Sequence, residues 1–266
     1  MSEIRFNGSS AAQMRIANAY WGEHVARYKF AQRMVQDCRV LDIACGTGFG
    51  IPCLSAKARL VVGVDLEWEA VSKASHEIYS SSVSVLMANG CSLPFQNCSF
   101  DVATSFETLE HLEARSGFLA ELRRVLKPGG LCILSTPNAH YTQPVNGKPQ
   151  NPFHVFEYTP EELVAELSQH FSVLSVLGQT LAERFSIPPF QDAQNKLPRT
   201  PWLQVKLIGW RLVNKLPLKA RERLSQIVWQ EPFYPGEYDY QFSPLTTEGA
   251  PVLLALCQRS ESEGEL

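Results

Sequence analysis

Short apolar segments alternate with helix-like segments from residue 39 onward, and this alternation constrains the fold more than any other feature of the chain. The segments LVVGVD and LCILST are apolar at almost every position, which is typical of strands that are buried on both faces of a sheet. Strands that alternate with helices predict a mainly parallel sheet with helices on both faces. We therefore predict an α/β fold.

Local signals place the expected elements along the chain. Lys127-Pro128-Gly129-Gly130 is a strong breaker after a helical segment, and Thr159 followed by Pro160 is typical of a helix start. Strands are expected at 39–43, 60–64, 82–87, 100–106, 131–136, 171–177 and 251–257, and helices at 11–37, 67–79, 117–126 and 159–169.

The length of 266 residues suits one sizeable domain. We interpret 1–38 as an N-terminal helical cap and 180–250, which is rich in proline and aromatic residues, as an insertion or lid before the last strand. The tail 259–266 is short and acidic. The prediction is thus a single domain over 1–266 with these three additions.

Composition narrows the functional class. Hydrophobic residues make up 45% of the chain, and the formal net charge is −3, so there is no basic field to attract nucleic acid. No apolar run approaches the roughly 18 residues of a membrane span. The seven cysteines are scattered without a CxxC pair, which favours reduced thiols and a cytoplasmic location.

A glycine-rich turn directly follows the first predicted strand. It reads Asp42-Ile43-Ala44-Cys45-Gly46-Thr47-Gly48-Phe49-Gly50, and glycines at a strand-to-helix turn let the backbone approach a ligand closely. The spacing is G-x-G-x-G, whereas dinucleotide-binding proteins use G-x-G-x-x-G. The second predicted strand ends at Asp65, a carboxylate that can accept both ribose hydroxyls of a nucleoside.

Several further motifs occur in a fixed order. They are VLDIACGTGFG, GVDLEWEA, LPFQNCSFDV, FETLEHL, ELRRVLKPGGLCILSTPN and NPFHVFEYTPEEL. In this order and spacing the sequence resembles the class I S-adenosylmethionine-dependent methyltransferases of the broad type 11 group, over roughly 15–178 and the last strand. The resemblance implies a Rossmann-like seven-stranded sheet in the order 3-2-1-4-5-7-6 with the last strand antiparallel, and S-adenosylmethionine as cofactor.

The resemblance also implies residue roles. The glycine-rich turn would line the methionine end of the cofactor. Asp65 would hold the ribose, and Leu66 would lie against the adenine. Asn89 stands where the family usually has an aspartate, and its side-chain oxygen can still accept a hydrogen bond from the adenine amino group. The full set of predicted cofactor residues is Asp42, Ala44, Gly46, Gly48, Asp65, Leu66, Asn89, Gly90 and Phe106.

Two loops offer groups for proton transfer to and from an acceptor. Glu107, Glu110 and His111 follow the fourth predicted strand, and His154 follows the fifth. Both loops border the same edge of the sheet, so they can converge over the cofactor. Histidine titrates near neutral pH, which suits general base catalysis on a hydroxyl group. We therefore predict these four residues as catalytic.

A second interpretation uses the same four side chains as ligands of a divalent metal. The constellation also resembles the small-RNA 3′-terminal 2′-O-methyltransferases, and two carboxylates with two imidazoles suit Mn²⁺ or Fe²⁺ better than Mg²⁺. We assign no metal ligand on these patterns and keep metal-dependent RNA ribose methylation as an alternative. A non-catalytic cofactor-binding partner or regulator is another alternative.

The predicted acceptor is a small molecule, a sugar-containing metabolite or a lipid-linked compound, methylated on oxygen. Methylation on nitrogen or carbon is also open, since amines can react without a strong base. Nucleic acid is a disfavoured partner. The basic, amphipathic segment 202–223 is interpreted as a lid over the acceptor pocket, and contact with an anionic membrane surface is the alternative. The sequence does not indicate an oligomeric state.

Overall fold

The computed structural model describes residues 21–78, 80–182, 201–228, 230 and 232–261. These residues fall into two compact units. One unit holds the described residues of 27–180 and 242–261, and the other holds those of 21–26, 181–182 and 201–241. The start of the predicted helix 11–37 and the end of the predicted tail 259–266 lie outside the described residues, and the division into one domain with a cap and an insertion stays a prediction.

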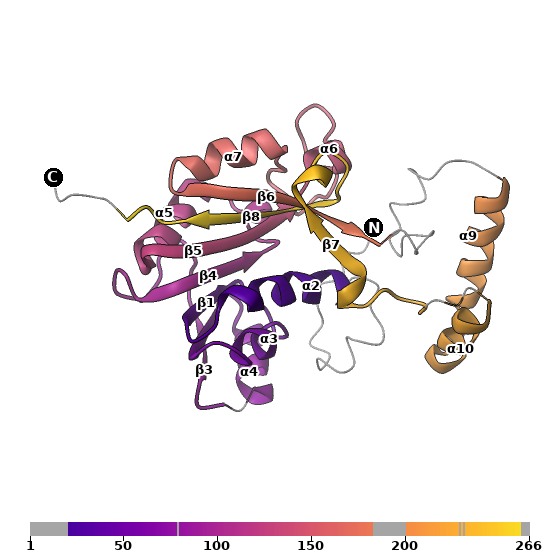
Figure 1. Cartoon of the computed structure of the whole chain (residues 1–266), viewed down its shortest axis with the longest axis horizontal. Coiled ribbons are helices and arrows are strands. Elements are labelled where there is room, and N and C mark those ends of the chain that lie inside the picture. Colours follow the sequence, from indigo (N-terminus) through magenta and orange to yellow (C-terminus); the bar gives the residue numbers. More distant parts are fainter. Residues whose placement is uncertain (1–20, 79, 183–200, 229, 231, 262–266) are drawn as a thin grey trace. The chain divides into compact units, whose positions relative to one another are not determined.

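An eight-stranded sheet forms the centre of the first unit (Figure 1). Its order is β3-β2-β1-β4-β5-β8-β6-β7, and β8 runs antiparallel to both β5 and β6. The strands are β1 (Arg39–Ile43), β2 (Leu60–Asp65), β3 (Val83–Met87), β4 (Phe100–Phe106), β5 (Leu126–Pro137), β6 (Ser172–Leu181), β7 (Tyr240–Ser243) and β8 (Val252–Gln258).

The predicted methyltransferase-type sheet is confirmed, with one correction to the strand count. The seven predicted strands take the predicted order, because β6 and β8 correspond to the sixth and seventh. The prediction of seven strands was wrong, since β7 adds an eighth at the edge beside β6. It lies inside the predicted insertion, and its four residues are too few to show an alternating pattern in the sequence.

Helices pack on both faces of the sheet, as the apolar strands predict. One face packs against α5 (Arg115–Val125) and α7 (Pro160–Ser168) through a large core that includes Leu41 and Leu134. The other face packs against α2 and α3 through Val40, Val61 and Ile133. The remaining bounds are α2 (Trp21–Ala31), η1 (Gln32–Met34), α3 (Ile51–Ser55), α4 (Trp68–Glu77), η2 (Leu109–His111), α6 (Ala139–Thr142), η3 (Glu237–Asp239) and η4 (Pro244–Thr246).

Residues 127–130 were predicted to separate a helix from the next strand, but the structure places them within that strand. They follow the end of α5, and β5 already starts at Leu126 and runs through both glycines. Gly129 adopts a φ of +74°, and the pairing of β5 with β4 shifts register between Phe100 and Val102. The glycines therefore produce an irregularity within an extended strand instead of a separate turn.

Two helices of the second unit span the segment that was predicted as a lid. They are α9 (Pro201–Val213) and α10 (Leu218–Val228). No helix among the described residues is long and apolar enough to cross a membrane. Membrane contact through 202–223 stays a prediction.

The predicted start of α7 is confirmed in detail, and it fixes the end of the loop that carries His154. The Thr159 hydroxyl accepts a hydrogen bond from the Glu162 amide at 3.2 Å, and the Glu162 carboxylate accepts one from the Thr159 amide at 2.9 Å. This reciprocal pair is a capping box.

Thr159→Ala should lower the free energy of unfolding by about 1 kcal/mol, because it leaves the Glu162 amide without its side-chain acceptor. Thr159→Ser keeps that hydroxyl and should remain close to the wild type. Urea unfolding of the three proteins measures the effect. Equal destabilisation by both substitutions would contradict the role of the cap.

Candidate active site

The carboxyl ends of the parallel strands β1, β2, β4 and β5 meet at one edge of the sheet. Open α/β sheets bind ligands at this edge. The predicted cofactor-binding residues lie on or just after the strands β1, β2, β3 and β4. The predicted catalytic residues lie just after β4 and, for His154, in the loop between β5 and α7.

The turn after β1 is built from backbone conformations that favour glycine. Ala44, Gly46 and Gly48 have φ values of +56°, +55° and +76°, all in the left-handed region. A side chain added at Gly48 would collide with Ile78, whereas none of the described atoms lies within 4 Å of the corresponding position at Gly46. Gly48 is therefore needed for packing, and Gly46 leaves open space beside the turn.

Asp65 at the end of β2 ties the two strand ends together. One carboxylate oxygen accepts a hydrogen bond from the Gly46 amide at 2.7 Å, and the other accepts one from the Glu67 amide at 3.0 Å. Each oxygen still has a free lone-pair direction. The carboxylate is thus held in place while it can accept further hydrogen bonds, as the two hydroxyls of a ribose would require.

The remaining predicted cofactor residues differ in surroundings. Leu66 is 68% exposed, so it offers an apolar surface at the site edge. The Asn89 side-chain oxygen accepts a hydrogen bond from the Cys91 amide at 2.9 Å and so braces its own turn. Gly90 lies against Phe118, where a side chain would clash at 2.8 Å. Phe106 ends β4 and packs edge-on against Tyr28.

Asp42 is buried within β1, and its carboxylate receives two hydroxyl groups. Thr104 donates to it at 2.6 Å and Tyr28 at 3.1 Å. Burial raises the pKa of Asp42 to about 7, although these two hydrogen bonds oppose the rise. Tyr28 also lies directly against Gly50, where its ring leaves no room for a side chain.

Glu107 is the first residue after β4, and its backbone is strained. It has a φ of +54°, which is uncommon for a residue with a side chain. Its carboxylate accepts a hydrogen bond from the Ser135 hydroxyl at 2.7 Å and lies 3.7 Å from the Arg27 guanidinium. Strain of this kind is concentrated at functional sites.

Glu110 is almost completely buried in η2, and it joins the two loops. Its backbone carbonyl accepts a hydrogen bond from the Val155 amide at 2.7 Å, and the Thr136 hydroxyl donates to its Oε2 at 3.1 Å. Its Oε1 has no hydrogen-bond partner among the described residues. Burial, followed by the nearby Glu107 carboxylate, raises the pKa of Glu110 well above its usual value.

The imidazoles of His111 and His154 face each other in a T-shaped contact, with ring centroids 4.9 Å apart. His111 Nδ1 lies 2.9 Å from the Phe153 carbonyl oxygen. His154 Nδ1 lies 2.6 Å from the Glu157 carboxylate, and its Nε2 lies 2.9 Å from Asn151 Nδ2. The structure therefore brings all four predicted catalytic residues to one end of β4 and β5.

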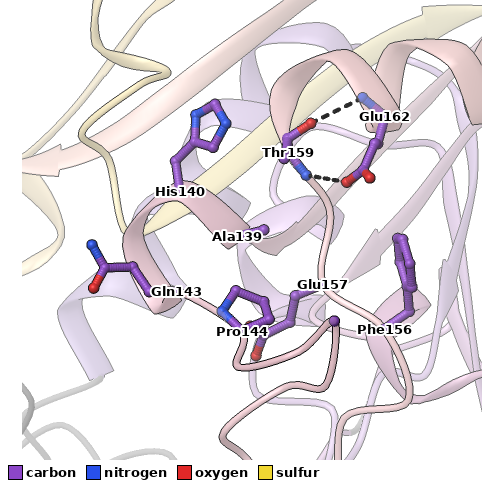
Figure 2. Close-up of a pocket in the computed structure, with 9 residues that line it drawn as sticks. Ala139, His140, Gln143, Pro144, Phe156, Glu157, Thr159 and Glu162 are labelled. Carbon is purple, nitrogen blue, oxygen red and sulfur yellow. Dashed lines mark hydrogen bonds between the residues drawn. The ribbon is translucent and has the colours of Figure 1, made fainter.

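A hollow of about 430 Å³ lies beside this cluster (Figure 2). Glu157 lines the hollow and also binds His154, so one carboxylate connects the hollow to the imidazole pair. Thr142 donates a hydrogen bond to the same carboxylate. The other residues of its wall are Ala139, His140, Gln143, Pro144, Gly147, Phe156, Thr159 and Glu162.

Sequence patterns did not indicate every residue that supports the site. Three hydroxyl side chains on β4 and β5 donate to Asp42, Glu107 and Glu110, and short hydroxyl residues in buried strands carry no motif. Glu157 was visible in the sequence three residues after His154, but its role as a partner of that imidazole was not predicted. The supporting residues that were missed are Thr104, Ser135, Thr136, Asn151 and Glu157.

Comparison with known proteins identifies the class. Residues 41–134 match the family model described as "Methyltransferase domain". A protein of Mycobacterium tuberculosis named "probable S-adenosylmethionine-dependent methyltransferase" is 35% identical over 57% of this chain and 55% of its own length. The "ubiquinone biosynthesis O-methyltransferase" of Thiobacillus denitrificans is 33% identical over 38% of this chain and 44% of its own length. The chain thus spans about half the length of these relatives.

Solved structures agree with the fold. An S-adenosylmethionine-dependent methyltransferase of Mesorhizobium loti matches 91% of this chain and 98% of its own length, with a TM-score of 0.52 and 19% identity. The likeness in fold agrees with the family match, which identifies residues 41–134 as a methyltransferase domain similar to proteins named as S-adenosylmethionine-dependent methyltransferases. S-adenosylmethionine is the cofactor that this class implies, and the open backbone at Gly46 beside the anchored Asp65 carboxylate fits it.

The raised pKa of Asp42 leads to a prediction about stability. Because the pKa of Asp42 is higher in the folded state than in the unfolded state, the folded protein favours the protonated carboxyl group. The resulting contribution to the free energy of unfolding is complete below the unfolded pKa, near 3.8, and is lost as the pH rises toward 7. Asp42→Asn should therefore raise the free energy of unfolding at pH 8 by about 1–4 kcal/mol, since one pKa unit corresponds to about 1.4 kcal/mol.

Urea unfolding at pH 8 and pH 5 tests this prediction, and the gain from Asp42→Asn should shrink at the lower pH. Asp37→Asn, at an exposed position, is the control and should show no such pH dependence. A gain from Asp42→Asn that is the same at both pH values would show that the carboxyl group is not destabilised by ionisation.

Proposed function

We propose that this chain transfers the methyl group of S-adenosylmethionine to a hydroxyl group of a small-molecule, sugar-containing or lipid-linked acceptor. The observation that carries the proposal is the contact between the imidazoles of His111 and His154, which lie in the loops that follow β4 and β5. Several relatives are named as methyltransferases, and one is named for O-methylation in ubiquinone biosynthesis.

The cofactor side of the proposal rests on residues after β1 and β2. When bound, S-adenosylmethionine supplies an electrophilic methyl group on a positively charged sulfur. Asp65 would hold the ribose hydroxyls, and Leu66 would cover the adenine. The turn from Ala44 to Gly48 would run along the methionine portion, since its backbone leaves open space at Gly46. The role of this chain is mainly to orient the two reactants, which can lower a barrier by about 7–11 kcal/mol in favourable cases.

The acceptor side rests on the cluster after β4 and β5. During transfer a carbon–oxygen bond forms, the carbon–sulfur bond breaks, and its electron pair stays on sulfur. The acceptor hydroxyl must also lose its proton. An imidazole nitrogen with a free lone pair can take that proton, and a histidine general base is the most direct form of this chemistry. The hollow bounded by Glu157 would hold the rest of the acceptor.

His111→Ala should lower the rate of methyl transfer to a hydroxyl acceptor by about 10²–10⁴-fold, the usual contribution of a general base. The cofactor affinity should not change, since His111 lies on the acceptor side. Transfer from labelled S-adenosylmethionine to a panel of hydroxylated small molecules provides the rate. His76→Ala, on the exposed side of α4, is the matched control. Full activity of His111→Ala on every accepted hydroxyl compound would refute the role of the imidazole.

A further inference from the structure

One tyrosine of α2 contacts three parts of the cofactor side of the candidate site. Tyr28 is buried in the core on this face of the sheet, and its hydroxyl donates to the Asp42 carboxylate on β1 at 3.1 Å. Its ring packs edge-on against Phe49 in the glycine-rich turn and against Phe106 at the end of β4, with centroid distances of 5.4 Å and 4.9 Å. A single side chain therefore links α2 to β1, to the turn and to β4.

The ring of Tyr28 also accounts for the third glycine of the G-x-G-x-G spacing. Gly50 has a φ of −84° and a ψ of −23°, which is a right-handed backbone that any residue can adopt. A side chain at this position would instead collide with the Tyr28 ring. Gly46 and Gly48, in contrast, have positive φ values. The first two glycines therefore shape the turn, whereas the third permits the close approach of α2.

The hydroxyl groups of Tyr28 and Thr104 reach Asp42 from two different elements. Tyr28 donates from α2, and Thr104 donates from β4 at 2.6 Å. Asp42 is fully buried, and a buried carboxylate is costly unless donors replace the lost water. Burial raises the pKa of Asp42 to about 7, the two hydrogen bonds lower it, and the nearby Asp65 raises it. The two hydroxyl groups therefore stabilise the charged form of Asp42.

The other titratable groups around Asp42 keep their protons when it titrates. Burial, followed by Asp42, raises the pKa of Tyr28 well above its usual value, although Arg27 opposes the rise. Burial, followed by Asp42 and Asp65, also raises the pKa of the Cys45 thiol. The Tyr28 hydroxyl and the thiol therefore stay protonated from about pH 5 to about pH 9, and the Arg27 guanidinium stays charged. Tyr28 remains a donor over this whole range.

We propose that Tyr28 is a positioning residue of the cofactor site, whose ring fixes the glycine-rich turn and whose hydroxyl orients the Asp42 carboxylate and stabilises its negative charge. S-adenosylmethionine carries positive charge on its sulfur and on its amino group, and the family resemblance places Asp42 at this end of the cofactor. A carboxylate near positive charge strengthens the binding. The inference rests on the cofactor part of the proposed function and does not depend on the identity of the acceptor.

Cofactor binding should therefore depend on pH. The positive charge of the cofactor favours the carboxylate form of Asp42, so the affinity should increase as the pH rises through about 7, with release of a proton. Without the Tyr28 hydroxyl the pKa of Asp42 is higher, and this increase moves to a higher pH. Loss of packing alone would weaken the binding by the same factor at every pH.

Calorimetric titration with S-adenosylmethionine at pH 7 and pH 9 tests this role. Tyr28→Phe keeps the ring and removes the hydroxyl. It should bind about fivefold more weakly than the wild type at pH 7 and almost equally at pH 9, as expected for the loss of one hydrogen bond to a charged group. Thr104→Val removes the other donor and should change the affinity in the same direction. Tyr158→Phe, at a buried tyrosine in the core on the opposite face of the sheet, should bind as the wild type does.

Urea unfolding of the cofactor-free proteins gives a second readout of the same contact. Tyr28→Phe should lower the free energy of unfolding more at pH 9, where Asp42 is charged, than at pH 5, where it is protonated. Tyr158→Phe should show no such difference. Gly50→Ala, which displaces the Tyr28 ring, should weaken cofactor binding at both pH values and so separates packing from the hydroxyl. Circular dichroism checks the fold of each variant.

Equal cofactor affinity of the wild type and Tyr28→Phe at pH 7 would overturn the role of the hydroxyl, and so would a loss of the same size at pH 9. Absence of binding by the folded wild type would overturn the inference together with the cofactor site. The expected pattern of affinities without methyl transfer to any hydroxyl acceptor would support the role of Tyr28 and count against O-methylation alone.

Discussion

The hydrogen bond from the Gly46 amide to the Asp65 carboxylate joins the ends of two neighbouring strands, and the cofactor side of the site depends on it. The contact is 2.7 Å long, and it links the glycine-rich turn to the residue predicted to hold the ribose. Parallel pairing of β1 with β2 brings the two ends together, and the left-handed backbone at Gly46 points its amide at the carboxylate without placing a side chain in the open space.

A second backbone contact organises the acceptor side in the same way. The Glu110 carbonyl accepts the Val155 amide, so the turn after β4 and the loop before α7 are held against each other. This contact brings His111 beside His154 although the two residues are far apart in the sequence. The candidate site therefore consists of two groups of residues, and in each group a hydrogen bond joins a loop to a neighbouring strand end or turn.

Much of this arrangement could be predicted from the sequence, because it rests on local patterns. The bounds of β4 and the Thr159 cap match the prediction, since an apolar strand and a capping box are encoded by consecutive residues. The order of the sheet followed from a family resemblance. The strand β7 was missed because its four residues leave too short a pattern.

The supporting contacts of the site could not be predicted, because they form between distant segments. Thr136 and Glu157 meet Glu110 and His154 only after β5 and the following loop have folded back. The hydrogen-bond partners of both imidazoles, such as the Phe153 carbonyl, are revealed by no motif. The sequence indicated the residue types of the cluster, and the structure adds which group each ring nitrogen contacts.

Calorimetric titration with S-adenosylmethionine tests the central claim most directly, with the wild type and Asp65→Ala compared side by side. The account predicts micromolar binding by the wild type and at least tenfold weaker binding by the variant, or about 1.4 kcal/mol, because the carboxylate that holds the ribose and the Gly46 amide is removed. Absence of binding by the folded wild type, or equal affinity of the two proteins, would contradict the placement of the cofactor at the ends of β1 and β2.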